Sequence, residues 1–223
     1  MRNAVLAVFA IAGSAIAQQH VSIPTEDGGR IYADIYGRGE RGVVLAHGGR
    51  RSKDNWAPQA RVLENAGFRV LAFDFRGFGQ SKGPKQADFD NAPFQLDVLA
   101  AVRYLRNAGA RHIAVVGGSF GGEACADAVV SAQPGEIERL IELAAASGNL
   151  PAEQMTVPKL IIVAREDAND AGRRLPGIQK SFDRMPEPKQ LIVLEGSAHA
   201  QFLFETDQSE RVMREILRFL AAP

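Results

Sequence analysis

The sequence has little cysteine, and this shortage excludes several kinds of site. Cys125 is the only cysteine among the 223 residues. No internal disulfide is therefore possible, and no cluster of cysteine and histidine has the spacing of a zinc site. Because Cys125 follows Ala124 in a predicted helix, we expect it to be a small buried apolar residue. We expect no metal and no cofactor.

The sequence also has no excess of either charge. It contains 26 lysines and arginines and 26 aspartates and glutamates, so its formal net charge is zero. Proteins that bind nucleic acid or an anionic membrane surface carry an excess of basic residues. The balance therefore indicates neither partner for this chain.

The apolar run at the N-terminus is too short to cross a membrane. It covers residues 4–11, follows Arg2, and gives way to small residues that end in Ala15-Ile16-Ala17. A transmembrane helix needs about 20 apolar residues, whereas this pattern is typical of a secretory signal peptide, residues 1–17, cleaved after Ala17. We expect an exported protein, periplasmic or secreted, with no stable membrane insertion after cleavage. An uncleaved N-terminal anchor is the alternative.

The remaining residues, 18–223, are expected to form one domain, because no Pro/Ser-rich linker and no repeat divides them. Short β-branched runs alternate with helical patterns, which predicts an α/β fold with a mostly parallel sheet covered on both faces. The predicted strands are residues 21–24, 30–36, 43–46, 69–73, 113–116, 137–144, 159–163 and 190–194. The predicted helices are residues 55–66, 93–107, 123–132 and 209–221.

One serine lies among glycines in the stretch VVGGSFGG, residues 115–122. Gly117-x-Ser119-x-Gly121 follows a predicted strand and precedes a predicted helix, as in the nucleophile elbow that lifts a serine oxygen clear of a sheet. A phosphate-binding loop needs Lys followed by Ser or Thr after its glycines, and Glu123-Ala124 stands there instead. An ordinary glycine-rich turn between strand and helix is the alternative.

A serine nucleophile needs a base, and the sequence has four histidines. His20 lies near the start of the predicted domain, and His47 and His112 lie at a strand end and a strand start. His199 follows the predicted strand 190–194 by a few residues. Loops after parallel strands gather on one edge of a sheet, so His199 can meet Ser119 there. A structural, hydrogen-bonded histidine is the alternative.

The base needs an acid that orients it, and PKLIIVAREDAND, residues 158–170, supplies three candidates. Glu166, Asp167 and Asp170 all follow the predicted strand 159–163. Asp167 has the offset from the strand end that fits best, so we assign it as the acid. The alternative is a surface acidic cluster that caps the next helix.

The order Ser119, Asp167, His199 is the order found in α/β-hydrolases. From Val21 to its end the chain resembles a serine hydrolase of the α/β-hydrolase fold. The resemblance implies a small-molecule ester as substrate and a covalent acyl-enzyme intermediate. The alternatives are a peptidase or a thioesterase with the same triad, and a non-catalytic binding module of the same fold.

Two further stretches carry the resemblance. LAHGGR, residues 45–50, is similar to the loop after the third strand that supplies an oxyanion-hole N–H. The resemblance assigns this N–H to Gly49 and the second one to Phe120, while His47 and Gly48 shape the loop. DFRGFGQS, residues 74–81, is similar to a turn common in this fold, in which Asp74 and Arg76 have a structural role.

The spacing of the later elements leaves no room for a cap over the site. The residues between 144 and 160 are too few for several helices, so we expect an open site. The size and the missing cap are similar to the dienelactone-hydrolase-like branch, but that branch uses a cysteine where this chain has Ser119. Epoxide hydrolases of the same fold use an aspartate.

The segment after Gly49 is basic, with Arg50, Arg51 and Lys53 ahead of Trp56. Next to an oxyanion hole, the guanidinium groups of Arg50 and Arg51 are candidates to hold a carboxylate or phosphate of the substrate. The alternative is a solvated charged loop whose side-chain stems pack on the surface.

Overall fold

Eight strands form the central sheet in a computed structural model that describes residues 18–84 and 91–222. The predicted signal peptide, residues 1–17, lies outside the described residues. In spatial order the strands are β1 (Gln19–Pro24), β2 (Arg30–Tyr36), β4 (Arg69–Asp74), β3 (Arg41–Ala46), β5 (His112–Gly118), β6 (Arg139–Leu143), β7 (Lys159–Ala164) and β10 (Lys189–Leu194). The eight-stranded sheet expected from the sequence is confirmed.

The sheet is parallel from β4 to β10 and antiparallel at its first edge. β1 pairs antiparallel with β2, and β2 pairs antiparallel with β4. All the other neighbouring strands run parallel, so their carboxyl ends meet at one edge of the sheet. Loops at this edge bring together residues that are distant in sequence.

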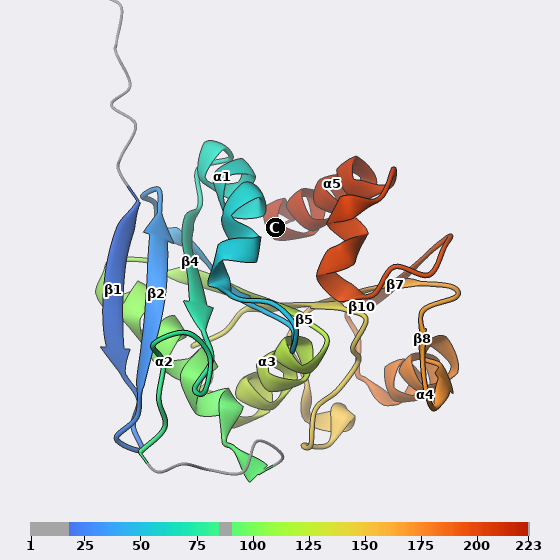
Figure 1. The fold of residues 1–223 in the computed structure, drawn as a ribbon, viewed down its shortest axis with the longest axis horizontal. Coiled ribbons are helices and arrows are strands. Elements are labelled where there is room, and N and C mark those ends of the chain that lie inside the picture. The colour runs from blue at the N-terminus through green and yellow to red at the C-terminus, as the bar shows by residue number, and fades with distance from the viewer. Residues whose placement is uncertain (1–17, 85–90, 223) are drawn as a thin grey trace, which may run out of the picture.

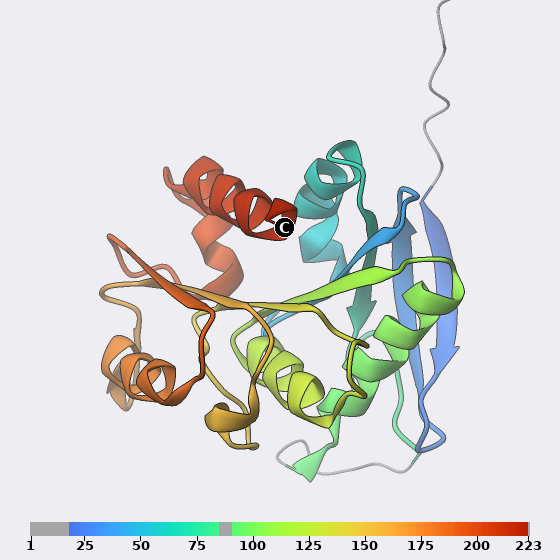
Figure 2. The same ribbon diagram turned by 180° about the vertical axis from the view of Figure 1, so that it is seen from behind.

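Helices cover both faces of the sheet, as expected. On one face lie α1 (Ala57–Asn65) and α5 (Ser209–Ala221), and on the other lie α2 (Phe94–Asn107), α3 (Phe120–Ser131) and α4 (Leu175–Arg184) (Figures 1 and 2). α3 begins three residues earlier than the expected start, directly after Ser119. Among the described residues, 3-10 helices span Lys53–Trp56, Ala152–Gln154 and Ala200–Glu205.

Burial on both faces explains why the central strands are almost wholly apolar. Every residue of β7 is buried, and in β3 every residue after Arg41 is buried. A parallel sheet between two layers of helices requires this pattern. Cys125 is fully buried in α3, which confirms its expected position, and burial raises the pKa of its thiol.

The segment between β7 and β10 contains elements that the sequence analysis missed. A small hairpin pairs β8 (Ala168–Asn169) with β9 (Gly172–Arg173), and α4 follows it. Parallel neighbours such as β7 and β10 need a crossover, and α4 supplies it. α4 was difficult to recognise because Gly177 weakens its helix propensity, and within the helix only Ile178 is buried.

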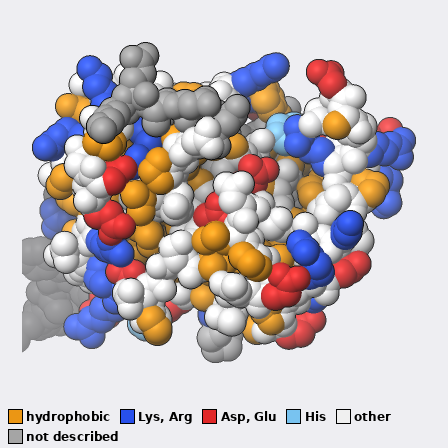
Figure 3. Space-filling model, turned by 90° about the horizontal axis from the view of Figure 1, so that it is seen from below, with side chains coloured by type: hydrophobic (Ala, Val, Ile, Leu, Met, Phe, Trp, Pro, Cys, Tyr) orange, Lys and Arg blue, Asp and Glu red, His pale blue; other side chains and the backbone are white. Residues whose placement is uncertain are grey.

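The face that carries α2, α3 and α4 has a mixed surface. Figure 3 shows hydrophobic side chains interspersed with acidic and basic ones over this face. Among the described residues, no helix has both the length and the apolar character needed to cross a bilayer.

Candidate active site

Ser119 lies in a strained turn between β5 and α3. Its backbone has φ 55° and ψ −129°, a conformation that non-glycine residues rarely adopt. The Ser119 N–H donates to Leu143 O over 2.9 Å, and the Ser119 carbonyl accepts from Gly122 N–H over 2.7 Å. These hydrogen bonds hold the turn against the end of β6 and the start of α3.

Glycines flank Ser119 because other segments approach the turn closely. A Cβ at Gly122 would lie 2.9 Å from Cβ of Ala145, and a Cβ at Gly117 would meet the backbone of Gly121. A Cβ at Gly121 would meet the carbonyl of His47. None of these three glycines has a positive φ, so the required property is the missing side chain.

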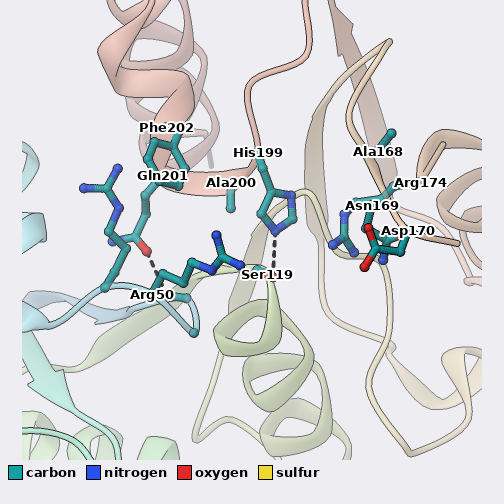
Figure 4. A pocket seen from close by; sticks show the side chains of 13 residues that line it. Arg50, Ser119, Ala168, Asn169, Asp170, Arg174, His199, Ala200, Gln201 and Phe202 are labelled. Atoms are coloured by element: carbon teal, nitrogen blue, oxygen red, sulfur yellow. Dashed lines mark hydrogen bonds between the residues drawn. The ribbon is translucent and has the colours of Figure 1, made fainter. Parts of the chain in front are cut away.

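The structure brings Ser119, His199 and Asp167 together by two hydrogen bonds. His199 Nε2 lies 2.8 Å from Ser119 Oγ, and His199 Nδ1 lies 2.8 Å from Asp167 Oδ2 (Figure 4 shows the first contact). Because an ionised carboxylate only accepts, Nδ1 carries the proton of the imidazole and Nε2 is left to accept from the serine hydroxyl. This is the arrangement in which a histidine can remove a serine proton.

Burial separates Asp167 from the other two acids of its loop. Asp167 is 1% exposed, whereas Glu166 and Asp170 are exposed. Glu166 pairs at the surface with Arg173, with 3.2 Å between the nearest charged atoms. Of the three acids considered from the sequence, Asp167 is the one that His199 contacts.

Arg174 contacts the carboxylate of Asp167, and the sequence analysis did not identify it as a site residue. Its Nε lies 3.5 Å from Asp167 Oδ1, and its backbone N–H donates to Asp167 O over 2.9 Å. Arg174 closes the β8–β9 hairpin against Asp167. No local motif marks this residue, because its partnership depends on how the hairpin folds back.

Gln201 fixes the loop after β3 and was also missed. Its Oε1 accepts from Gly48 N–H over 2.8 Å, and its side chain is 5% exposed. A Cβ at Gly48 would lie 3.5 Å from Cβ of Ser119, so this loop passes directly beside the nucleophile turn. The signal available in the sequence was the position of Gln201, two residues after His199.

His47 holds the same loop from the inside. It is fully buried, its Nδ1–H donates to Gly48 O over 2.8 Å, and its Nε2 accepts from Phe75 N–H over 3.2 Å. Burial lowers the pKa of His47, which favours the neutral imidazole that these contacts require. Its contacts are therefore those of a residue that shapes the loop.

Gly49 and Phe120, the two residues assigned to the oxyanion hole, lie against each other. A Cβ at Gly49 would be 3.7 Å from Cδ1 of Phe120. Phe120 is the first residue of α3, where backbone N–H groups point out of the helix end. Phe120 follows Ser119 directly in the chain, and Gly49 lines the same cleft as Ser119.

An open cleft of about 470 Å³ leads to Ser119 and His199. Both arginines considered from the sequence, Arg50 and Arg51, line it. The other lining residues are Gly48, Gly49, Ala168, Asn169, Asp170, Arg174, Ala200, Gln201 and Phe202. Only a 3-10 helix, Ala152–Gln154, lies between β6 and β7, so the expected absence of a cap of several helices agrees with this architecture.

The turn that begins at Asp74 makes structural contacts. Arg76 is buried and pairs with Asp97 at 2.7 Å and with Asp27 at 2.6 Å. The hydrogen bond from Arg76 lowers the pKa of Asp27 to about 2. Asp74 Oδ1 accepts from Lys53 N–H over 2.8 Å and so ties this turn to the loop after β3.

Glu142 is a buried acid below the nucleophile turn. It is fully buried in β6, beside Gly117 of β5, and neither carboxylate oxygen has a hydrogen-bond partner among the described residues. Burial raises the pKa of Glu142 well above its usual value. A charged residue inside an apolar strand was the signal for it in the sequence.

The family model described as alpha/beta hydrolase fold matches residues 42–207. The chain belongs to the α/β-hydrolase fold family. This membership, together with the topology of the sheet, confirms the α/β-hydrolase fold that the resemblance implied. Within the described residues there is no group of three or more His, Cys, Asp or Glu side chains that could hold a metal ion.

Several α/β-hydrolases are similar to this chain. A non-heme chloroperoxidase of Streptomyces lividans is 34% identical over 125 residues, which cover 56% of this chain and 44% of that protein. A bifunctional esterase/perhydrolase of Acinetobacter calcoaceticus is 37% identical over 102 residues, 45% of this chain and 35% of that protein. The chain thus spans less than half the length of these curated relatives.

Solved structures share the fold at lower identity. Esterase Pf2001 of Pyrococcus furiosus has a TM-score of 0.74 and 20% identity, and the match covers 97% of this chain and 96% of that one. A bromoperoxidase of Bacillus anthracis has a TM-score of 0.73 and 17% identity, covering 92% of this chain and all of that one. At these identities the likeness shows the fold alone.

Proposed function

We propose that the protein is a serine esterase that hydrolyses carboxylic esters of small or exposed substrates after export. The observation that carries this proposal is the hydrogen-bonded series from Asp167 through His199 to Ser119 at the floor of an open cleft. The esterase activity of the similar Acinetobacter calcoaceticus protein supports the same reaction class.

The first half of the reaction forms an acyl-enzyme. Ser119 Oγ attacks the ester carbonyl carbon while His199 Nε2 takes the hydroxyl proton. The N–H groups of Gly49 and Phe120 stabilise the negative charge that develops on the carbonyl oxygen. The carbon–oxygen bond to the alcohol then breaks, and His199 returns its proton to the departing alcohol. Asp167 orients the imidazole and stabilises its protonated form.

The second half releases the acid. Water attacks the acyl carbon and gives its proton to His199, and the bond to Ser119 Oγ breaks as the proton returns to the serine. The open cleft suits this step because water reaches the acyl group directly. It also suits substrates whose ester group is accessible, rather than long acyl chains that need an enclosed apolar pocket.

Turnover of 4-nitrophenyl acetate by the wild type and by Ser119→Ala tests the proposal. We expect Ser119→Ala to lose roughly 10⁶-fold in kcat, as for a serine that acts within a triad. The matched control is Ser131→Ala, an exposed serine at the end of α3, which should keep wild-type turnover. Equal rates for Ser119→Ala and wild type contradict the proposal, and faster cleavage of aminoacyl 4-nitroanilides than of esters redirects it to a peptidase.

A further inference from the structure

The cleft carries more positive charge than the rest of the chain. Basic and acidic residues balance over the whole sequence. The ionisable side chains that line the cleft besides His199 are three arginines, Arg50, Arg51 and Arg174, and one aspartate, Asp170. A cleft lined by one sign of charge attracts ligands of the other sign.

Arg51 is already engaged by its neighbours. Its Nη2 lies 2.5 Å from Glu205 Oε1, and its guanidinium carbon lies 3.9 Å above the centre of the Phe202 ring. The Arg51 side chain is also largely buried, at 16% exposure. These contacts neutralise Arg51 and hold it in place as part of the wall.

Arg174 is anchored at one end and accessible at the other. Its Nε lies 3.5 Å from Asp167 Oδ1 and has no hydrogen-bond acceptor among the described residues. The side chain is 30% exposed, so part of the guanidinium faces the cleft that it lines. A guanidinium held at one edge presents its remaining N–H groups in a fixed fork, which matches a carboxylate.

Arg50 lies on the opposite side of the cleft. It follows Gly49 directly and is exposed. In Figure 4, Ser119 and His199 lie between Arg50 on one side and Arg174 on the other. A substrate that reaches Ser119 therefore passes between two guanidinium groups.

We propose that the cleft selects esters that carry a carboxylate near the scissile bond, held by Arg50 and Arg174. This inference rests on the esterase activity proposed above and names its substrate class. Asp170 lines the same cleft and repels a doubly charged group more strongly than a singly charged one. A monoanionic carboxylate therefore fits this set of charges better than a phosphate dianion.

A pair of esters that differ only in charge tests the selection. The anionic member is mono-4-nitrophenyl glutarate, and the neutral member is its methyl ester. We expect wild-type kcat/KM to be roughly tenfold higher for the anionic member, about 1.4 kcal/mol, and we expect the ratio to fall as NaCl is raised. A ratio of one or less, with the neutral ester still hydrolysed, overturns the inference and leaves the esterase proposal standing.

Single variants test whether Arg50 and Arg174 cause the preference for the anionic ester. Arg50→Gln and Arg174→Gln should each lower the anionic-to-neutral ratio at least about threefold. The control is Arg38→Gln, an exposed arginine between β2 and β3 at the opposite edge of the sheet, which should keep the wild-type ratio. A wild-type ratio in both Arg50→Gln and Arg174→Gln overturns the assignment. Because Arg174 contacts Asp167, Arg174→Gln can also lower total activity. Its effect is therefore measured as the ratio of kcat/KM for the anionic and neutral esters.

Binding to Ser119→Ala separates the anion site from catalysis. Calorimetry should detect monomethyl glutarate at concentrations where the neutral dimethyl glutarate does not bind. Anion binding without hydrolysis of either ester would sink the esterase proposal and keep the anion site. Equal binding of the two compounds would overturn the anion site, whatever the rate of hydrolysis.

Discussion

The two sides of the cleft are built in different ways. On the elbow side, the start of the loop after β3 and the turn at Ser119 pack backbone against glycine so closely that a Cβ at Gly121 would meet the His47 carbonyl. On the hairpin side, residues 165–174, charged side chains dominate, and one acid, Asp167, is buried while its neighbours are exposed. The elbow side carries Ser119, the hairpin side carries the acid that contacts His199, and both sides place arginines in the cleft.

This comparison explains which residues local patterns reveal. Tight backbone packing needs glycine at fixed positions, so it leaves a motif such as Gly117-x-Ser119-x-Gly121. Burial of a single acid depends on the path of a hairpin and leaves no such motif. We therefore expect substitutions on the elbow side and on the hairpin side to change different properties of the protein, and by different amounts.

The largest expected effect distinguishes the acids of the hairpin side from one another. Asp167→Asn should lower kcat by roughly 10⁴, because an amide favours the wrong tautomer of His199. Glu166→Gln and Asp170→Asn, which change exposed side chains, should cost no more than about tenfold. Steady-state turnover of 4-nitrophenyl acetate measures all three. High activity in Asp167→Asn with a large loss at position 166 or 170 would require the triad to be redrawn.

The next prediction tests whether Gln201 holds the loop after β3 in place. Gln201→Leu removes the acceptor of the Gly48 N–H and leaves that donor buried, which costs about 1–3 kcal/mol. If this loop stabilises the oxyanion, kcat should fall roughly 10- to 100-fold with little change in KM. Gln154→Leu, an exposed glutamine in the 3-10 helix Ala152–Gln154, is the control. A change in KM alone would show that Gln201 contacts the substrate rather than positioning the loop.

A third prediction tests the effect of the buried acid Glu142 on stability. Because burial raises the pKa of Glu142, the folded state holds a proton that the unfolded state releases above about pH 4.3. Stability conferred by this proton is lost as the pH rises from that value towards the folded pKa. Glu142→Gln removes the loss, so its stability relative to wild type should increase by about 1.4 kcal/mol for each pH unit in this window.

Urea unfolding of wild type and Glu142→Gln at several pH values measures this difference. Glu210→Gln, an exposed glutamate in the first turn of α5, is the matched control and should follow the wild type. Parallel stability curves for Glu142→Gln and wild type would mean that Glu142 ionises at its ordinary pH in the folded protein.

The smallest expected effect concerns Arg51, which follows Arg50 in the loop after β3. Arg51→Gln should change the selectivity for anionic over neutral esters by less than about threefold, because Glu205 already neutralises Arg51. The same ester pair measures it. A loss of selectivity larger than that of Arg50→Gln would place the anion site on Arg51 instead.

Much of the fold was predictable from the sequence. The eight strands appear as separate runs rich in β-branched residues, and burial on two faces makes central strands such as β3 and β7 almost wholly apolar. The helix Leu175–Arg184 was missed, although Leu175, Ile178 and Phe182 have the spacing of one helical face. Pro176 and Gly177 obscured that pattern.

The site was predictable to the extent that it depends on loops at strand ends. Ser119, Asp167 and His199 each follow a strand, and the parallel sheet brings those ends together. Gln201 and Arg174 were missed because their partners, the Gly48 N–H and the Asp167 carboxylate, are defined only after the chain folds. Sequence patterns therefore indicated the three side chains that the structure brings into contact, and the structure adds the residues that hold the surrounding loops.

Labelling with a fluorophosphonate tests the central claim, that His199 and Asp167 activate Ser119, most directly. Intact-mass measurement of the folded protein should show one adduct per chain, and peptide mapping should place it on Ser119. Ser119→Ala should remain unlabelled, and His199→Ala should react far more slowly, because the serine then keeps its proton. An unlabelled folded wild type, or an adduct on another residue, would contradict the claim.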